Sequence, residues 1–269
     1  MMKNITLGQF MPGDSVVHRL DPRCKLGLTL AYIVGVFLVK GVAGYGVTAL
    51  LIALVARWAR IPLKYLLRGL KPLKWIVIFT AVLNLFMAGG EDVLVSLWKI
   101  KITMTGVRNA FYFTFRLAFL VMGTSVLTLT TSPIVLTDAL EHVMSPLKVI
   151  KFPAHEIAMM MTIALRFIPT LTEEAQKIMN AQSARGADFE TGNLFQRAKA
   201  MVPLLVPLFV SAFRRAGDLA MAMEARCYHG GAGRTRMKQL KLTWRDAVAA
   251  AALAAMYAVI IALNVLKVF

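Results

Sequence analysis

Long apolar stretches separated by short polar ones mark the first half of the chain and its C-terminal end. Residues 26–56 are apolar except for an interruption at Lys40 and Gly41. A membrane-spanning helix needs about 20 residues, and each half of this stretch is shorter. We therefore expect two short or tilted spans that turn near Lys40, with one long span and a re-entrant piece as the alternative. Three further spans are expected from the remaining apolar stretches, at 75–88, 106–131 and 246–269.

Residues 132–245 have a different pattern, in which apolar residues recur every seven positions along two segments. Residues with this spacing lie on one face of a helix. Ser132 and Pro133 predict the start of a first helix that runs to about Ser145. Two longer helices are expected at about 153–185 and 194–226, the second kinked at Pro203 and Pro207. Their apolar lines are Ile157, Ala164, Leu171 and Ile178, which lead to Arg185, and Leu205, Ala212 and Leu219, which lead to Arg226.

The two long helices are expected to end in the same way, at Ala184-Arg185-Gly186 and at Ala225-Arg226-Cys227. Gly186 predicts the C-terminal stop of the first helix, and Gly230 and Gly231 predict a stop a few residues late for the second. Small alanines before each arginine leave the guanidinium group unhindered. An arginine at a helix C-terminus can simply complement the helix macrodipole, and the pattern alone does not decide between that role and a binding role.

Composition supports an integral membrane protein of the all-α class. The chain of 269 residues is 58% hydrophobic and carries a formal net charge of +17. Nucleic-acid binding is excluded because no basic run is interleaved with stacking aromatic residues. The basic excess fits the positive-inside bias of membrane proteins, and residues 57–74, which contain six basic residues and no acid, predict a cytoplasmic loop with an interfacial helix.

The charge asymmetry predicts a multi-pass topology with about five transmembrane helices. The N-terminus is expected inside and the C-terminus outside, with residues 89–101 also outside. The expected regions are 1–131 with four spans, 132–245 as a cytoplasmic-side domain of three helices, and 246–269 as the last span. Arg116 lies inside the fourth span, where a structural or snorkelling role is favoured over a functional one because no span contains an acidic partner.

The sequence contains none of the usual catalytic or cofactor signatures. Two cysteines and four histidines at these spacings do not build a metal site. Glu173 and Glu174 lack the partners of a metalloprotease or intramembrane protease, and no glycine-rich phosphate loop or Ser/His/Asp arrangement is present. We therefore expect no enzymatic activity, no metal, no cofactor and no ATP site in this chain.

Three stretches resemble the transmembrane T component of energy-coupling factor transporters, over nearly the full length. The first is Pro12-Gly13-Asp14-Ser15 with the segment His18–Arg23. The most specific is Ile157–Gly186, and the third is Met223-Glu224-Ala225-Arg226. Cys227 stands where glycine is frequent in that family, at a variable position.

The resemblance implies a subunit of an ATP-driven vitamin or micronutrient importer in the plasma membrane of a prokaryote. Its partners would be two cytosolic ABC ATPases, which alone bind ATP, and a membrane S component that binds substrate. The two long helices would be crossing coupling helices whose X-Arg-X ends, Ala184-Arg185-Gly186 and Ala225-Arg226-Cys227, each meet one ATPase. The S component would dock on apolar residues of both helices: Met160, Met161, Ala164, Leu165, Ile168, Leu205, Leu208 and Phe209. A self-contained permease and a scaffold without ATPases remain as alternatives.

Overall fold

The computed structural model describes residues 10–87, 93–97, 100–189, 193–231 and 239–265. Its chain divides into two compact units. The first, here called the bundle unit, comprises residues 8–139 and 240–269. The second, here called the crossing unit, comprises residues 140–239.

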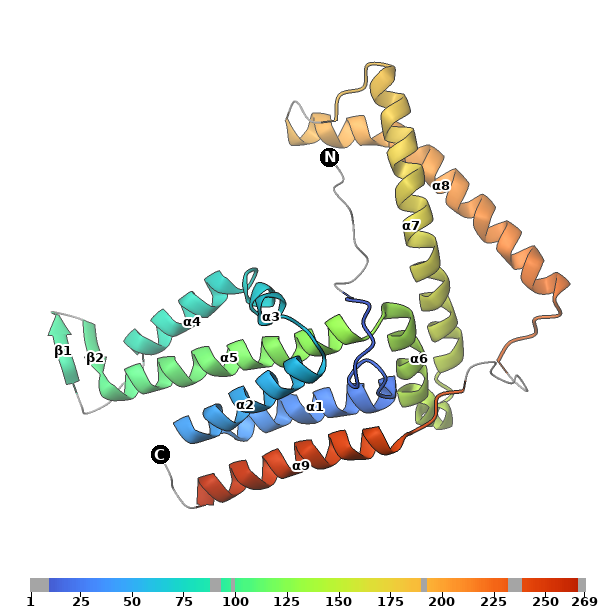
Figure 1. The fold of residues 1–269 in the computed structure, drawn as a ribbon. Coiled ribbons are helices and arrows are strands. Elements are labelled where there is room, and N and C mark those ends of the chain that lie inside the picture. Colours follow the sequence, from blue (N-terminus) through green and yellow to red (C-terminus); the bar gives the residue numbers. More distant parts are fainter. Residues whose placement is uncertain (1–9, 88–92, 98–99, 190–192, 232–238, 266–269) are drawn as a thin grey trace. The chain divides into compact units, whose positions relative to one another are not determined.

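The bundle unit is built around α5 (Met104–Thr130), which packs against α1 (Pro22–Leu38), α2 (Val42–Trp58), α3 (Leu63–Leu70) and α4 (Lys74–Met87). The C-terminal helix α9 (Trp244–Val265) returns to pack on α1 and α2 (Figure 1). The core therefore combines helices from both ends of the chain. Its most buried side chains include Tyr32, Val36, Val39, Tyr45, Ile52, Leu66, Phe119, Leu253, Met256 and Ile260.

The stretch 26–56 forms two helices, which confirms the expected division near Lys40. Each helix has 17 residues, and α2 begins after the extended residue Gly41. Arg116 of α5 donates a hydrogen bond to the carbonyl of Val39 at the end of α1, 3.2 Å away, and its guanidinium lies over the rings of Phe37 and Phe113. Arg116 thus satisfies a helix-end carbonyl between two helices, which is the structural role favoured from the sequence.

The basic loop contains the short amphipathic helix α3, whose Leu66 is fully buried. After α4, a short antiparallel hairpin of β1 (Val93–Leu97) and β2 (Ile100–Thr103) leads into α5, and Thr103 caps that helix by accepting a hydrogen bond from the Gly106 N–H. This hairpin is the exception to the predicted all-α class, which the rest of the described chain confirms.

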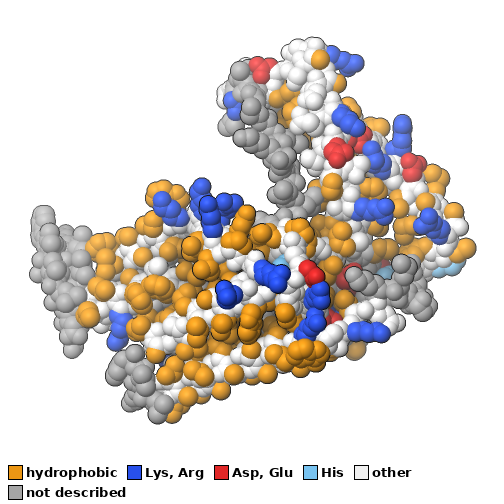
Figure 2. All heavy atoms as spheres, in the orientation of Figure 1, with side chains coloured by type: hydrophobic (Ala, Val, Ile, Leu, Met, Phe, Trp, Pro, Cys, Tyr) orange, Lys and Arg blue, Asp and Glu red, His pale blue; other side chains and the backbone are white. Residues whose placement is uncertain are grey.

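Three described helices are long and apolar enough to cross a membrane: α5, α9 and residues 195–225 of α8 (Leu194–Ala225). Helices α2 and α4 are shorter and apolar. Hydrophobic side chains cover most of the visible face of the bundle unit (Figure 2), as a membrane protein requires. It was not expected that α8 would be long and apolar enough to cross a membrane, because the sequence pattern placed it in the cytoplasmic-side domain.

The crossing unit contains the end of α6 (Pro133–Met144), a 3₁₀ segment (Ser145–Ile150) and the two long helices α7 (Ala154–Ala184) and α8. The bounds of all three helices agree with those expected from the capping and stripe pattern. Helices α7 and α8 cross each other, and α8 changes direction along its length (Figure 1). Pro203 and Pro207 lie inside α8, and each removes a backbone donor, which accounts for a bend.

Candidate functional site

The end of α7 is closed by a pair of backbone hydrogen bonds around Arg185. The N–H of Gly186 donates to the carbonyl of Ser183, and the N–H of Ala187 donates to the carbonyl of Gln182, both at 3.0 Å. These are the two bonds of a Schellman motif, in which the residue after the cap adopts the left-handed conformation. Arg185 is therefore the C-cap residue, held in place by backbone geometry.

The end of α8 repeats the same arrangement around Arg226. The N–H of Cys227 donates to the carbonyl of Glu224 at 2.8 Å, and the N–H of Tyr228 donates to the carbonyl of Met223 at 3.1 Å. Each bond joins residues with the same spacing as in α7, so this is a second Schellman motif. The two arginines thus occupy equivalent positions at two helix ends, which the shared Ala-Arg step in the sequence only suggested.

The left-handed residue differs between the two ends. Gly186 has φ of 89°, whereas Cys227 has φ of 56°. The expectation that Gly230 and Gly231 stop α8 is wrong: the helix ends at Ala225, and Cys227 takes the position that glycine has in α7. A cysteine in this region carries a steric cost that glycine does not.

Both guanidinium groups are exposed and available for binding. Arg185 and Arg226 are solvent-exposed, and within the described part of the chain neither has a hydrogen-bond or ion-pair partner. Each lies beside the last helix carbonyls, whose partial negative charge favours a cation there. Each end therefore offers a planar, bidentate donor on a backbone that is already fixed.

The middle parts of the two apolar stripes face each other where α7 and α8 pack together. They line a cavity of about 390 Å³, with Ala164, Ile168 and Leu171 from α7 and Ala212 and Leu219 from α8. The seven-residue lines seen in the sequence are thus partly used for contact between the two helices.

A polar cluster joins α7 to α8 near this cavity. Ser211 donates a hydrogen bond to Glu174 Oε1 at 2.5 Å, and Arg215 donates to Glu174 Oε2 at 2.8 Å. The hydrogen bond from Ser211, with the charge of Arg215, lowers the pKa of Glu174 below its ordinary value. The sequence around Glu174 suggested only a comparison with protease residues and did not reveal this role, because its partners lie 37 and 41 positions away.

The residues expected to form the S-component docking surface are all at least partly accessible. Met160 and Phe209 have relative exposures of 58% and 60%. Leu165 and Leu208 are half-buried, whereas the others are exposed. Only Ala164 and Ile168 of this set line the cavity between the helices. The exposed members are Met160, Met161, Ala164, Ile168, Leu205 and Phe209.

The exposed apolar face of α8 is wider than the sequence analysis expected. Val206, Val210 and Phe213 are also exposed, Phe213 to 75%. Their spacing of four and three residues places them on one helix face. The sequence pattern did not reveal this line, because only the helix face with the two seven-residue lines, Leu205–Arg226 and Val202–Met223, was considered. A helix apolar on more than one face requires lipid or a protein partner to cover it.

Polar residues of the N-terminal stretch 12–23 form a largely buried hydrogen-bond network in the bundle unit. Asp21 accepts from the N–H of Arg23 and caps α1, and the N–H of Asp21 donates to Asp246 at 2.8 Å. The His18 Nε2 lies 3.1 Å from the carbonyl of Met11, and its Nδ1 lies 2.7 Å from Ser15 Oγ. These bonds tie the N-terminal segment to the start of α9 and give Ser15, His18 and Asp21 a structural role.

The described residues contain no cluster of three or more His, Cys, Asp or Glu side chains that could hold a metal ion. The arrangement of the crossing unit is suited to binding. Its features are two exposed arginines at fixed helix ends, apolar faces, and the ion pair of Glu174 with Arg215 between α7 and α8.

Comparison with known proteins places these features in a family. Residues 13–238 match the cobalt transport protein family, CbiQ. The energy-coupling factor transporter transmembrane protein EcfT of Thermosediminibacter oceani is 55% identical over 248 residues, which cover 92% of this chain and 93% of that protein. The protein of the same name from Clostridium kluyveri is 54% identical over 93% of each chain. That of Bacillus subtilis is 47% identical over 91% of this chain and 93% of its own. The chain therefore belongs to the CbiQ family and is an EcfT-type transmembrane component of an energy-coupling factor transporter.

Proposed function

We propose that this chain transmits the ATP-driven movement of two ABC ATPase subunits to a substrate-binding S component through α7 and α8. The observation that carries the proposal is the equivalence of the two helix ends, each a Schellman motif with an exposed arginine at the C-cap. Two equivalent ends suit two related partners. Hydrolysis of ATP is assigned to those partners, and this chain has no catalytic role.

The arginines are suited to anchor the ATPases. A guanidinium group forms two parallel hydrogen bonds with a carboxylate and keeps its charge at all physiological pH values. Because Arg185 and Arg226 have no intrachain partner among the described residues, docking does not first have to break a bond. The fixed backbone at each end reduces the entropy lost on binding.

The S component is proposed to cover the exposed apolar residues of α7 and α8. Methionines such as Met160 and Met161 adapt to different surfaces, and Phe209 offers a large apolar contact. Coverage by a membrane subunit also explains why α8 is as apolar as a membrane-spanning helix while it belongs to the crossing unit.

The polar cluster of Glu174, Ser211 and Arg215 is proposed to make α7 and α8 move together. It lies between the docking residues and the arginine ends along both helices. A movement imposed at Arg185 would then reach α8 through this contact, and one imposed at Arg226 would reach α7.

In the proposed topology, the N-terminus, residues 57–74 and residues 131–245 lie on the cytoplasmic side of the plasma membrane. The C-terminus lies outside. The support is the distribution of lysine and arginine along the chain. This topology places the arginine ends on the side of the membrane where ATP is available.

The proposal is tested by recovering the ATPases with variants of this chain from membranes that contain equal amounts of each variant. Arg185→Ala or Arg226→Ala should each weaken retention about tenfold or more, since a charge-assisted hydrogen bond contributes about 1.5–3 kcal/mol. The double variant should retain almost none, because the second contact loses its linked partner. Lysine at either position should restore retention only in part.

Arg166→Ala and Arg214→Ala are matched controls, because both residues are exposed arginines within the same two helices. Both should retain the ATPases at the wild-type level. The proposal fails if the double variant retains the ATPases and supports uptake as the wild type does. It also fails if the two control substitutions weaken retention as much as the substitutions at Arg185 and Arg226.

A further inference from the structure

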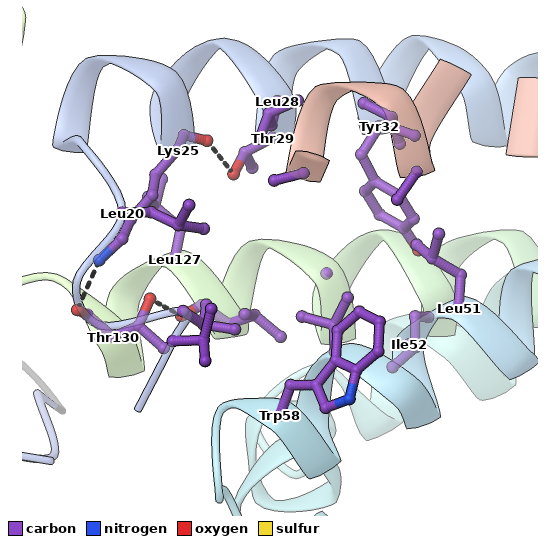
Figure 3. A pocket seen from close by; sticks show the side chains of 18 of the residues that line it. Leu20, Lys25, Leu28, Thr29, Tyr32, Leu51, Ile52, Trp58, Leu127 and Thr130 are labelled. Atoms are coloured by element: carbon purple, nitrogen blue, oxygen red, sulfur yellow. Dashed lines mark hydrogen bonds between the residues drawn. The ribbon is translucent and has the colours of Figure 1, made fainter. Parts of the chain in front are cut away.

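A second cavity, of about 220 Å³, lies in the bundle unit among α1, α2, α5 and α9 (Figure 3). It begins where α1 and α9 start and α2 and α5 end. Along α1 it extends from Lys25 to Tyr32, which at about 1.5 Å per residue is roughly 10 Å. Tyr32 closes the inner part, where its hydroxyl donates to the carbonyl of Phe119 at 2.9 Å.

The walls of this cavity are almost entirely apolar. Leu28, Ile52, Leu127 and Leu253 contribute aliphatic side chains from four different helices. Ordered water requires two to four polar partners, and apolar cavities of about 150 Å³ stay dry and accept apolar ligands. The space is therefore suited to a hydrocarbon group rather than to water or a polar solute.

The rim of the cavity is apolar and accessible. Trp58 has a relative exposure of 56%, and Val16 and Val248 are similarly exposed. Figure 3 shows the Trp58 ring extending from the end of α2 toward the space between the helices. An apolar opening on a bundle with a hydrophobic outer face admits molecules from the bilayer.

Two basic residues line the same end of the cavity. The Lys25 ammonium donates to the carbonyls of His18 and Thr130 at 3.0 and 3.1 Å, so it is held by neutral oxygens. Arg245 is half-buried, and neither residue forms an ion pair within the described chain.

Asp246, which follows Arg245 in the sequence, is engaged by groups other than these two cations. Asp246 accepts hydrogen bonds from the N–H groups of Asp21 and Thr243 and from the Thr243 hydroxyl. Both of its oxygens are thereby engaged. The charged side chains that line the cavity, Lys25 and Arg245, are both cations beside a hydrocarbon-lined space.

We propose that this cavity binds one acyl chain of an anionic phospholipid, whose headgroup phosphate lies against Arg245 and within the field of Lys25. Basic sites between transmembrane helices on the cytoplasmic side commonly bind anionic headgroups. The roughly 10 Å depth stays within one leaflet, since the whole hydrocarbon core is about 30 Å thick. The bound lipid fills the space between helices from both ends of the chain and holds α9 against α1.

The test uses the full chain in vesicles, with Trp58 as the reporter that lines the cavity. Trp75, Trp98 and Trp244 are replaced by phenylalanine, and the remaining fluorescence is quenched by lipids with brominated acyl chains. Brominated phosphatidylglycerol in a phosphatidylcholine background is compared with brominated phosphatidylcholine in a phosphatidylglycerol background. We expect quenching of Trp58 to show a preference of about fivefold or more for phosphatidylglycerol, which corresponds to ~1 kcal/mol per cation.

Arg245→Gln should reduce this preference toward one, and Ala249→Phe, which fills the cavity, should reduce quenching by both lipids. A variant that keeps Trp75 as its only tryptophan is the matched control, because that ring is exposed on α4 and does not line the cavity. Its quenching should show no such preference and should not respond to Arg245→Gln.

Equal quenching of Trp58 by the two lipids would overturn the proposal, as would a preference that survives both Arg245→Gln and Lys25→Met. The same quenching measurement in the assembled transporter tests whether a protein segment, and not lipid, occupies the cavity. If quenching of Trp58 disappears when the partner subunits are present, a protein segment fills the cavity and the lipid assignment is wrong.

Discussion

Replacement of Cys227 with glycine should stabilise the end of α8. Cys227 has φ of 56°, in the left-handed region, and closes the motif that places Arg226 at the C-cap. An L-residue in this region costs about 1–2 kcal/mol, which glycine avoids. Glycine also makes the unfolded chain more flexible, which offsets about 0.4–1 kcal/mol. The net gain should be roughly 0.8 kcal/mol, the difference between the midpoints of these two ranges.

The opposite change at the equivalent position of α7 should destabilise that end by a similar amount. Gly186 has φ of 89°, and an added Cβ would have no heavy atom within 4 Å. Gly186→Ala therefore introduces backbone strain without a steric clash. Gly217→Ala is the matched control, since that glycine also has open space but lies inside α8. There the same chemical change should stabilise the helix by about 1 kcal/mol.

Hydrogen exchange at the closing amides measures these local effects. The amides to follow are those of Tyr228 in the Cys227→Gly variant and Ala187 in the Gly186→Ala variant, because each donates the outer bond of its motif. After correction for intrinsic rates, exchange at Tyr228 should slow by about two- to tenfold, and exchange at Ala187 should accelerate by a similar factor.

Cys227→Ser keeps a side chain of similar size in the left-handed region and should leave Tyr228 exchange close to that of the wild type. The reasoning is refuted if Cys227→Gly accelerates exchange at Tyr228. It is also refuted if the serine and glycine variants protect this amide equally.

Three further predictions follow from other parts of the structure. The pKa of Glu174 is lowered in the folded protein, so the ionised side chain contributes stability above the ordinary glutamate pKa of 4.5. This stability is lost as the pH falls through the lower pKa of the folded state. Glu174→Gln should remove this pH dependence from the hydrogen exchange of α7 and α8. Single cysteines at Tyr65 and Glu190 should resist a membrane-impermeant thiol reagent in intact cells, whereas one at Phe269 should react; labelling of the first two would contradict the topology. The purified chain alone should hydrolyse no ATP, and activity that scales with its amount through successive purification steps would show otherwise.

The helix pattern of this chain is predictable because few residues decide it. The interruption at Lys40 and Gly41 separates α1 from α2, since neither half continues the apolar run. Gly186 locates the end of α7, because glycine adopts the left-handed conformation without strain. Both features depend on residues that are adjacent in the sequence.

The features that the sequence did not predict depend on distant residues or on a residue in an unfavourable conformation. Glu174 meets Ser211 and Arg215 only because α7 and α8 cross, and spacing along one helix does not report a crossing. The residue that closes α8 was misidentified as Gly230 or Gly231, because Cys227 adopts a conformation that cysteine seldom takes. The acyl-sized cavity could not be foreseen either, because four separate helices contribute its walls.

The central claim, that each arginine end contacts one ATPase, is tested most directly by cross-linking from those ends in native membranes. Cys227 is exposed beside Arg226, and with Cys24→Ser it becomes the only thiol. Ser183→Cys in a chain without both native cysteines places a thiol in the last turn of α7, and Val34→Cys on α1 serves as the control. A short thiol-to-photoreactive reagent should join Cys227 to one ATPase subunit and the residue-183 thiol to the other, with no ATPase captured from position 34. Capture of lipid or the membrane partner alone from both helix ends, in a transporter that still contains its ATPases, would contradict the account.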